Sequence, residues 1–196
     1  RIPDHPVAKK LIEVSGLPLA APSANRSGKP SPTSADHVYH DLNGRVAGIL
    51  DGGPTGVGLE STVVDCTTEV PVILRPGGVT KEEMKRIVGD VMIDPALIQT
   101  NQQPKSPGMK YNHYEPDVPL YLVEGDVAFF QSQIDALEGK GNKVGVIASK
   151  ELAANLATSH LTICGSQEDL RKVATSLYES LRSFKESDVD IILCES

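Results

Sequence analysis

The sequence lacks most of the features that would identify a function directly. Among its 196 residues there is no Trp, and aromatic side chains make up only 4% of the chain. Its apolar runs are far shorter than the ~18–20 residues that cross a bilayer, so a membrane-spanning helix is not expected. The opening residues RIPDHP show no signal-peptide pattern, and we expect the protein in the cytoplasm.

Cysteine is scarce and scattered. Cys66, Cys164 and Cys194 form no CxxC pair, so neither a zinc site nor a disulfide framework is predicted. Each ends an apolar, strand-like run (VVDC, LTIC, IILC), which predicts three buried free thiols in a reducing compartment. The patterns HExxH, GxSxG and GxxxxGK[ST] are also missing, so zinc-hydrolase and nucleophilic-hydrolase chemistry has no support.

The chain has no excess of positive charge. Lys and Arg number 19 against 26 Asp and Glu, a net charge of −7. Residues 94–196 hold 15 acidic and 9 basic side chains, whereas residues 1–93 hold 11 and 10. An acidic chain is a poor non-specific nucleic-acid binder, because that affinity comes mostly from cations on phosphates. The nearly neutral first half can still contain a local anion site.

Short elements separated by turn residues fill the first half. Gly16 is expected to cap the first helix in the left-handed conformation, and Thr80 to Glu83 form a capping-box pattern. The apolar pattern predicts helices at 7–14, 33–42 and 80–88 and strands at 17–22, 46–51, 60–66 and 70–75. The strands at 60–66 and 70–75 are expected to pair.

The second half alternates strand and helix as a parallel sheet does. The expected strands are 119–123, 143–148, 161–164 and 189–194, and the expected helices are 126–138, 150–157 and 167–184. The last helix has an apolar face made of Leu170, Val173, Ala174, Leu177, Leu181 and Phe184. This is a Rossmann-like βαβ array, but no GxGxxG follows its first strand, so a dinucleotide site is not predicted.

Proline-rich residues lie between these two halves and interrupt both patterns. The predicted division is therefore a domain at 1–93, a linker at 94–118 and a Rossmann-like accessory domain at 119–196.

Two of the four clusters that could carry chemistry are polar loops. PSANRSGKPSP at 22–32 offers backbone N–H groups and small hydroxyl and amide side chains to a phosphate, although the same composition is typical of plain turns. DGGPTGVGLESTVVD at 51–65 places Ser61 and Thr62 after a glycine-rich loop, where they could bind a polar substrate. Equally, Ser61 could simply end a strand and Thr62 could be a β-former.

The other two clusters are cationic and aromatic. Arg75 in LRPGG follows an apolar strand and could grip a phosphate or carboxylate in bidentate fashion, or form a surface salt bridge. SPGMKYNHYEP at 106–116 is too aromatic for a passive linker and could fold over a nucleotide and stack on it. Its His113 could be pH-sensitive, although a lone His is more often structural.

Taken together and in order, the four motifs resemble the YrdC-type threonylcarbamoyl-AMP synthases, in the longer subfamily with a linker and a C-terminal domain. The resemblance implies an α/β fold: the C-terminal portion of a YrdC-like twisted-sheet domain followed by a smaller Rossmann-like βαβ domain. It implies a cytoplasmic tRNA-modification enzyme that uses L-threonine, bicarbonate and ATP, with Mg²⁺ on the phosphates and no covalent nucleophile. Partner proteins would pass the product's threonylcarbamoyl group to tRNA.

The same resemblance assigns roles to individual residues. The residues expected to bind ATP are Ser23, Asn25, Ser31, Arg75, Tyr111 and Tyr114. The threonine pocket is expected at Ala21, Ser61 and Thr62, and His113 belongs to a linker gate over the active site. Family members also have an N-terminal part with a Lys-x-Arg motif and a further C-terminal helix. The chain is therefore expected to be a fragment with a truncated second domain and little synthase activity alone.

Three other functions remain open at this point. A double-stranded RNA or tRNA-binding module without catalysis is disfavoured by the net charge of −7. The carbamoyltransferase of hydrogenase maturation contains a YrdC-like domain, but the HYEP linker and an acidic βαβ domain would be out of place in it. A regulatory nucleotide-binding domain would bind nucleotide without turning it over.

Overall fold

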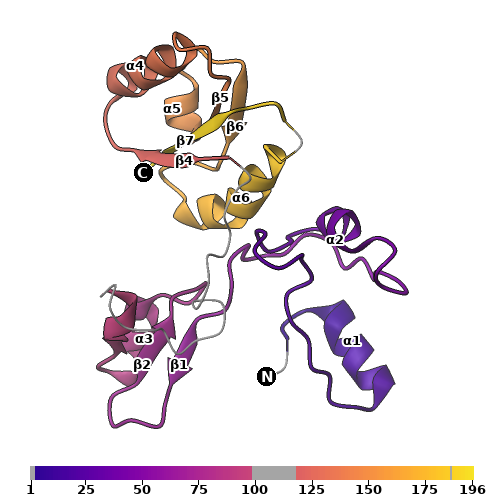
Figure 1. The fold of residues 1–196 in the computed structure, drawn as a ribbon. Helices are drawn as coiled ribbons and strands as arrows, with labels where there is room; N and C mark the ends of the chain where they lie inside the picture. Colours follow the sequence, from indigo (N-terminus) through magenta and orange to yellow (C-terminus); the bar gives the residue numbers. More distant parts are fainter. Residues whose placement is uncertain (1–2, 99–117, 186) are drawn as a thin grey trace.

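Two separate sheets organise the chain. The computed structural model describes residues 3–98, 118–185 and 187–196 (Figure 1). The first sheet has the order β1-β2-β3 and is mixed, because β1 pairs with β2 antiparallel and β2 pairs with β3 parallel. Its strands are β1 (Val63–Asp65), β2 (Val72–Arg75) and β3 (Met92–Ile93). The second sheet is parallel throughout, with the order β4-β7-β5-β6. The predicted α/β class is confirmed.

Every element of the alternation predicted for the second half is present. The strands are β4 (Leu120–Val123), β5 (Val144–Ala148), β6 (His160–Ile163) and β7 (Ile191–Glu195). The helices are α4 (Val127–Glu138), α5 (Lys150–Ala153) and α6 (Leu170–Ser183). The helix expected at 150–157 is shorter than predicted and ends at Ala153, where Asn155 turns its amide back onto the carbonyl of Glu151 at 3.0 Å.

The second sheet is buried on both faces, as parallel sheets are. Val144 and Val146 of β5 pack in one apolar cluster with Phe130 and Ile134 of α4. The alternate residue Ile147 packs in another cluster with Phe184, at the end of α6. Each face of this sheet therefore has its own core, one under α4 and α5 and the other under α6.

The first half contains the three predicted helices but little core. They are α1 (Pro6–Ser15), α2 (Ala35–Leu42) and α3 (Lys81–Val88), followed by the short 3₁₀ turn η1 (Pro95–Leu97). Gly16 caps α1 with a φ of 63°, and the capping box between Thr80 and Glu83 is formed. Within residues 3–98, Ile73 and Val91 are the buried apolar side chains.

The strands expected at 17–22 and 46–51 are not formed. Both segments lack a ladder partner among the described residues, and an apolar run becomes a strand only when a neighbour takes up its backbone hydrogen bonds. Their apolar side chains are exposed to solvent: Leu17 is 65% exposed and Leu50 is 66% exposed. The strand pair expected from 60–66 and 70–75 is confirmed as β1 and β2. The strand β3 is only two residues long and was not predicted.

The prediction of three buried thiols is wrong for one of them. Cys66 is exposed because it lies in the turn just beyond β1, whereas Cys164 is buried and Cys194 is half-buried. All three are free, as expected. Burial raises the pKa of the Cys164 thiol, and it raises that of Cys194 to about 11.

The division at 1–93, 94–118 and 119–196 stays a prediction, since 99–117 lie outside the described residues. In the part of the chain that is described, no helix is long and apolar enough to cross a membrane.

The exposure of the thiols leads to a simple test. A disulfide reagent at neutral pH should label one thiol per folded chain rapidly, and Cys66→Ser should abolish that rapid phase. Access controls the rate and favours the exposed Cys66, while burial shields Cys164 and raises the thiol pKa of both Cys164 and Cys194. Mass spectrometry would identify the labelled peptide. Rapid labelling of Cys164 or Cys194 in the folded protein would contradict the packing of the second sheet.

Candidate functional site

An open pocket of about 300 Å³, lined by hydroxyl and apolar side chains, lies between the loop 22–32 and residues 49–55. Ser23 and Ser31 from the loop, with Ser34 at the start of α2, line one side. Asp51, Gly52, Gly53 and Thr55 line the other. The N–H of Thr55 donates to the carbonyl of Thr33 at 2.9 Å, which joins the two sides. Small hydroxyl side chains and glycine backbone are typical surroundings for a phosphate group.

The amide of Asn25 shapes the loop from inside. Its Nδ2 donates to the carbonyls of Arg26 at 2.9 Å and of Lys29 at 3.0 Å, which closes the turn. Its Oδ1 is buried without a hydrogen-bond partner among the described residues. In the structure Asn25 therefore braces the loop that carries Ser31.

Arg75, Ser61 and Thr62 are brought together where the turn after β2 packs on the residues before β1. Arg75 donates twice to the carbonyl of Ser61, from Nε at 3.3 Å and from Nη2 at 2.8 Å. The Thr62 hydroxyl donates to the carbonyl of Val79 at 2.6 Å and accepts the N–H of Val79 at 3.1 Å. Only glycine fits at position 77, because a Cβ there would lie 2.3 Å from the Glu60 carbonyl oxygen.

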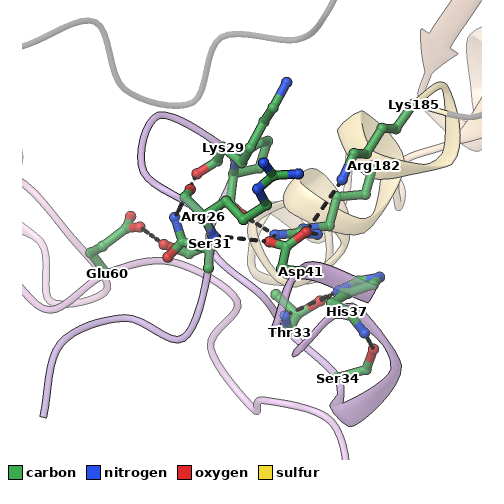
Figure 2. Close-up of polar contacts among 12 residues, drawn as sticks. Arg26, Lys29, Ser31, Thr33, Ser34, His37, Asp41, Glu60, Arg182 and Lys185 are labelled. Carbon is green, nitrogen blue, oxygen red and sulfur yellow. Dashed lines mark hydrogen bonds and ion pairs between the residues drawn. The ribbon is translucent and has the colours of Figure 1, made fainter. Parts of the chain in front are cut away.

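Glu60 links this cluster to the loop 22–32. The Ser31 hydroxyl donates to Glu60 Oε1 at 2.5 Å (Figure 2). The other carboxylate oxygen, Oε2, accepts a hydrogen bond from the Tyr178 hydroxyl of α6, also at 2.5 Å. The Glu60 carboxylate therefore joins the loop 22–32 to α6, while the Glu60 backbone carbonyl accepts the N–H of Gly78 from the motif 74–78 at 2.9 Å.

A second carboxylate, Asp41 of α2, is completely buried beside the same loop. Arg182 of α6 approaches it at 2.8 Å, and the side chains of the two residues are 0% and 6% exposed. Lys185 adds a further contact at 3.2 Å, as Figure 2 shows. The N–H of Arg26 donates to Asp41 Oδ2 at 3.3 Å, which ties the loop to this ion pair.

The surroundings of Asp41 keep its carboxylate charged. Burial raises its pKa, but the hydrogen bond and the positive charge of Arg182 outweigh burial, and Lys185 and the Arg26 N–H add to the effect. The net result is a pKa lowered to about 2. The group is therefore ionised throughout the neutral range and depends on its cations.

The residues assigned from the sequence fall into three groups: those at the pocket or the neighbouring cluster, one exposed residue that belongs to neither, and those outside the described residues. Ser23 and Ser31 line the pocket, and Arg75, Ser61 and Thr62 form the neighbouring cluster. Ala21 is exposed on the unpaired segment 17–22. Outside the described residues lie Tyr111, His113 and Tyr114. The ligand assigned to each of these residues stays a prediction.

Sequence reasoning missed four residues that hold the site together. Glu60, Asp41, Tyr178 and Arg182 carry its main long-range contacts. The only available signal was the spacing of Tyr178 and Arg182, four residues apart on one face of a helix. That spacing does not predict which residues of the first half these two side chains contact, here Glu60 and Asp41.

Comparison with known families accounts for nearly the whole chain. Residues 1–77 match the Sua5/YciO/YrdC family model, described as "Telomere recombination". Residues 79–196 match the model described as "Threonylcarbamoyl-AMP synthase, C-terminal domain". The junction between the two matches falls at Gly78, the last residue of LRPGG.

Individual relatives agree with this assignment. The threonylcarbamoyl-AMP synthase of Bacillus subtilis is 52% identical over 196 residues, 100% of this chain and 57% of that protein. The synthase of Pyrococcus abyssi is 43% identical over 200 residues, with the same coverage. The chain thus spans 57% of the length of these relatives. The expectations that an N-terminal part and the end of the second domain are missing stay predictions.

Solved structures have the same fold. The crystal structure of P. abyssi Sua5 complexed with L-threonine superposes with a TM-score of 0.89 at 40% identity, covering 100% of this chain and 57% of that one. A variant of P. abyssi Sua5 with a neighbouring His and Tyr changed to Ala gives a TM-score of 0.88.

Acid should weaken the contribution of Asp41 to stability. The unfolded carboxyl has a pKa near ~3.9, so the stabilisation is complete above that pH and disappears as the pH falls towards 2. The shift corresponds to on the order of 2 kcal/mol in the free energy of unfolding. Urea unfolding measures the free energy of unfolding at about pH 5 and at about pH 2. The decrease between these two pH values should be smaller in Asp41→Asn than in the wild-type chain, by about this amount. Parallel pH profiles for the two proteins would contradict the buried ion pair.

Proposed function

The chain belongs to the threonylcarbamoyl-AMP synthase family, and on that premise we propose that it forms part of the ATP and threonine sites of such an enzyme. The observation that supports this most directly is the pocket lined by Ser23 and Ser31, connected through Glu60 to the Arg75 cluster. Hydroxyl groups and glycine backbone in the pocket, with a guanidinium in the linked cluster, suit a polyphosphate.

The proposed reaction joins L-threonine, bicarbonate and ATP. The threonine amine and carbon dioxide or bicarbonate give a carbamate, and a carbamate oxygen attacks the α-phosphorus of ATP. A new O–P bond forms, the bond to the β-phosphate oxygen breaks, and pyrophosphate leaves with the electron pair. No protein side chain needs to form a covalent bond, so the protein contributes alignment and stabilisation of negative charge.

Ser23, Ser31 and Arg75 are proposed as contacts to the nucleotide. Asn25 would act by holding the loop, because its amide already closes the turn at Arg26 and Lys29. This role differs from the direct contact expected from the sequence.

The threonine pocket is proposed beside the nucleotide contacts, at Ser61, Thr62 and Ala21. The P. abyssi relative complexed with L-threonine supports threonine as the amino acid. Thr62 would shape the pocket through its two hydrogen bonds with Val79.

The linker residues are proposed to close over the bound nucleotide. Tyr111 and Tyr114 would stack on it, and His113 would belong to the same gate. The His-Tyr pair at 113–114 is the one such pair in the sequence, and a His-Tyr pair is also what was replaced in the P. abyssi variant.

Magnesium is proposed to enter with the phosphates of ATP. The described residues contain no group of three or more His, Cys, Asp or Glu side chains arranged to hold a metal ion. Among the residues that line the pocket, Asp51 is the carboxylate. Mg²⁺ is commonly held by one or two carboxylates together with substrate phosphates, so this donor set suits an ion carried by the nucleotide. The ion would neutralise phosphate charge.

Transfer of the product's threonylcarbamoyl group to tRNA through partner proteins, in the cytoplasm, completes the proposal. Direct RNA binding by this chain is less well supported. Two of its cations, Arg182 and Lys185, are committed to Asp41. A cation that neutralises a carboxylate releases few counterions from a phosphate backbone.

Ser31→Ala should weaken the binding of Mg-ATP roughly ten- to a hundredfold, because one hydrogen bond to a charged phosphate is lost. Isothermal titration of the purified chain measures the dissociation constant. Ser27→Ala is the matched control, since Ser27 is exposed in the same loop and does not line the pocket. Equal affinities for the wild-type chain and Ser31→Ala would contradict the proposed nucleotide contact.

The 196-residue chain alone should release pyrophosphate from ATP far more slowly than the B. subtilis relative, in a threonine-dependent assay with bicarbonate. The physical reason is the open apolar surface of 17–22 and 46–51, which leaves Ala21 and one side of the pocket uncovered. Equal rates per active site would show that these segments need no cover.

A further inference from the structure

Two faces of helix α6 contact different parts of the chain. One face carries Val173 and Leu177, which pack against the core of its own sheet. The other carries a polar stripe at spacings of four, three and four residues: Arg171, Thr175, Tyr178 and Arg182. Such spacing places all four side chains on one side of a helix. In Figure 1, α6 lies on the side of the second sheet nearest α2.

Each residue of the stripe contacts the first half of the chain. Arg171 pairs with Glu83 of α3 at 3.2 Å, but its side chain is 90% exposed, so this contact contributes little. The Thr175 hydroxyl lies 3.3 Å from the carbonyl oxygen of Gly56, although its shortest contact, 2.9 Å, is with the carbonyl of Arg171 in its own helix. The two remaining residues are buried: Arg182 reaches the carbonyl of Pro30 in the loop 22–32, and Tyr178 reaches Glu60.

The first buried contact runs through Glu60. The Tyr178 hydroxyl and the Ser31 hydroxyl donate to different oxygens of this carboxylate, each at 2.5 Å. The Ser31 hydroxyl thus gives its one proton to Glu60 in this structure, and it would turn from this carboxylate to a phosphate oxygen when nucleotide binds. A shift of Tyr178 would move the carboxylate and with it the hydroxyl of Ser31.

The second buried contact runs through Asp41 and the backbone of the loop. Arg182 donates to both oxygens of Asp41 and also to the carbonyl of Pro30, the residue before Ser31. Asp41 in turn accepts the N–H of Arg26. Both ends of the turn from Arg26 to Pro30 are therefore held from α6.

We propose that α6 positions the loop 22–32 for nucleotide binding, with Tyr178 acting through Glu60 and Arg182 acting through Asp41 and the Pro30 carbonyl. Tyr178, Glu60 and Arg182 are positioning residues. The inference rests on the proposed function, because it takes Ser31 as a nucleotide contact. It assigns the second domain an indirect part in nucleotide binding: the orientation of Ser31 depends on a helix more than 100 residues later in the chain.

Tyr178→Phe tests the first contact with the least disturbance, since it removes one hydroxyl and keeps the buried ring. Hydrogen–deuterium exchange of the backbone amides at 23–31 should become faster in this variant, while amides of β5 and β7 remain protected. The dissociation constant of Mg-ATP should rise roughly two- to tenfold. Tyr121→Phe is the matched control, because Tyr121 is 56% exposed on β4.

The double variant Ser31→Ala/Tyr178→Phe separates positioning from general loss of structure. If Tyr178 acts through Ser31, the second substitution should not weaken Mg-ATP binding further once Ser31 is Ala. Unchanged exchange at 23–31 in Tyr178→Phe would overturn the inference and leave the proposed function standing. Faster exchange throughout the second domain, or additive losses in the double variant, would also overturn it. An unchanged dissociation constant in Ser31→Ala would instead refute the proposed function.

Discussion

The carboxylate of Asp41 is buried between α2 and α6, where Arg182 compensates its charge and the Arg26 N–H joins it to the loop. A buried carboxylate is tolerated only when its partners stay in place, and loss of one partner typically costs about 3–5 kcal/mol. The two halves of the chain therefore cannot separate at this point without exposing Asp41 and Arg182 or leaving them unpaired. This constraint fixes where α6 lies and hence where Tyr178 meets Glu60.

The two halves differ in what stabilises them. The second sheet has an apolar core on each face, whereas the described residues 3–98 contain few buried apolar side chains. The loops of the candidate site are held mainly by polar contacts: Asn25 within its own turn, Thr62 on Val79, and Glu60 between Ser31 and Tyr178. A well-packed domain thus acts as the support for loops that have little core of their own. Precise placement of polar groups matters for charge stabilisation in phosphoryl chemistry.

Local signals in the sequence were sufficient for the elements that depend on local interactions. The capping box at Thr80 and the alternation of the second half predicted α3 and the parallel sheet. The segments 17–22 and 46–51 show the limit, because an apolar run does not specify its partner. The motifs identified the residues around the pocket, but the contact between Ser31 and Glu60 joins residues 29 apart and follows no local rule. On α6 the apolar face was predicted, whereas the equally regular polar face resembled an ordinary solvated surface.

A crystal structure of the chain with a non-hydrolysable ATP analogue and L-threonine tests the central claim most directly. The account predicts a phosphate oxygen within hydrogen-bond distance of the Ser31 hydroxyl, with Glu60 still bound to Tyr178 and Asp41 still paired with Arg182. A nucleotide bound away from the loop 22–32, or bound there after α6 has released Glu60 and Asp41, would contradict it.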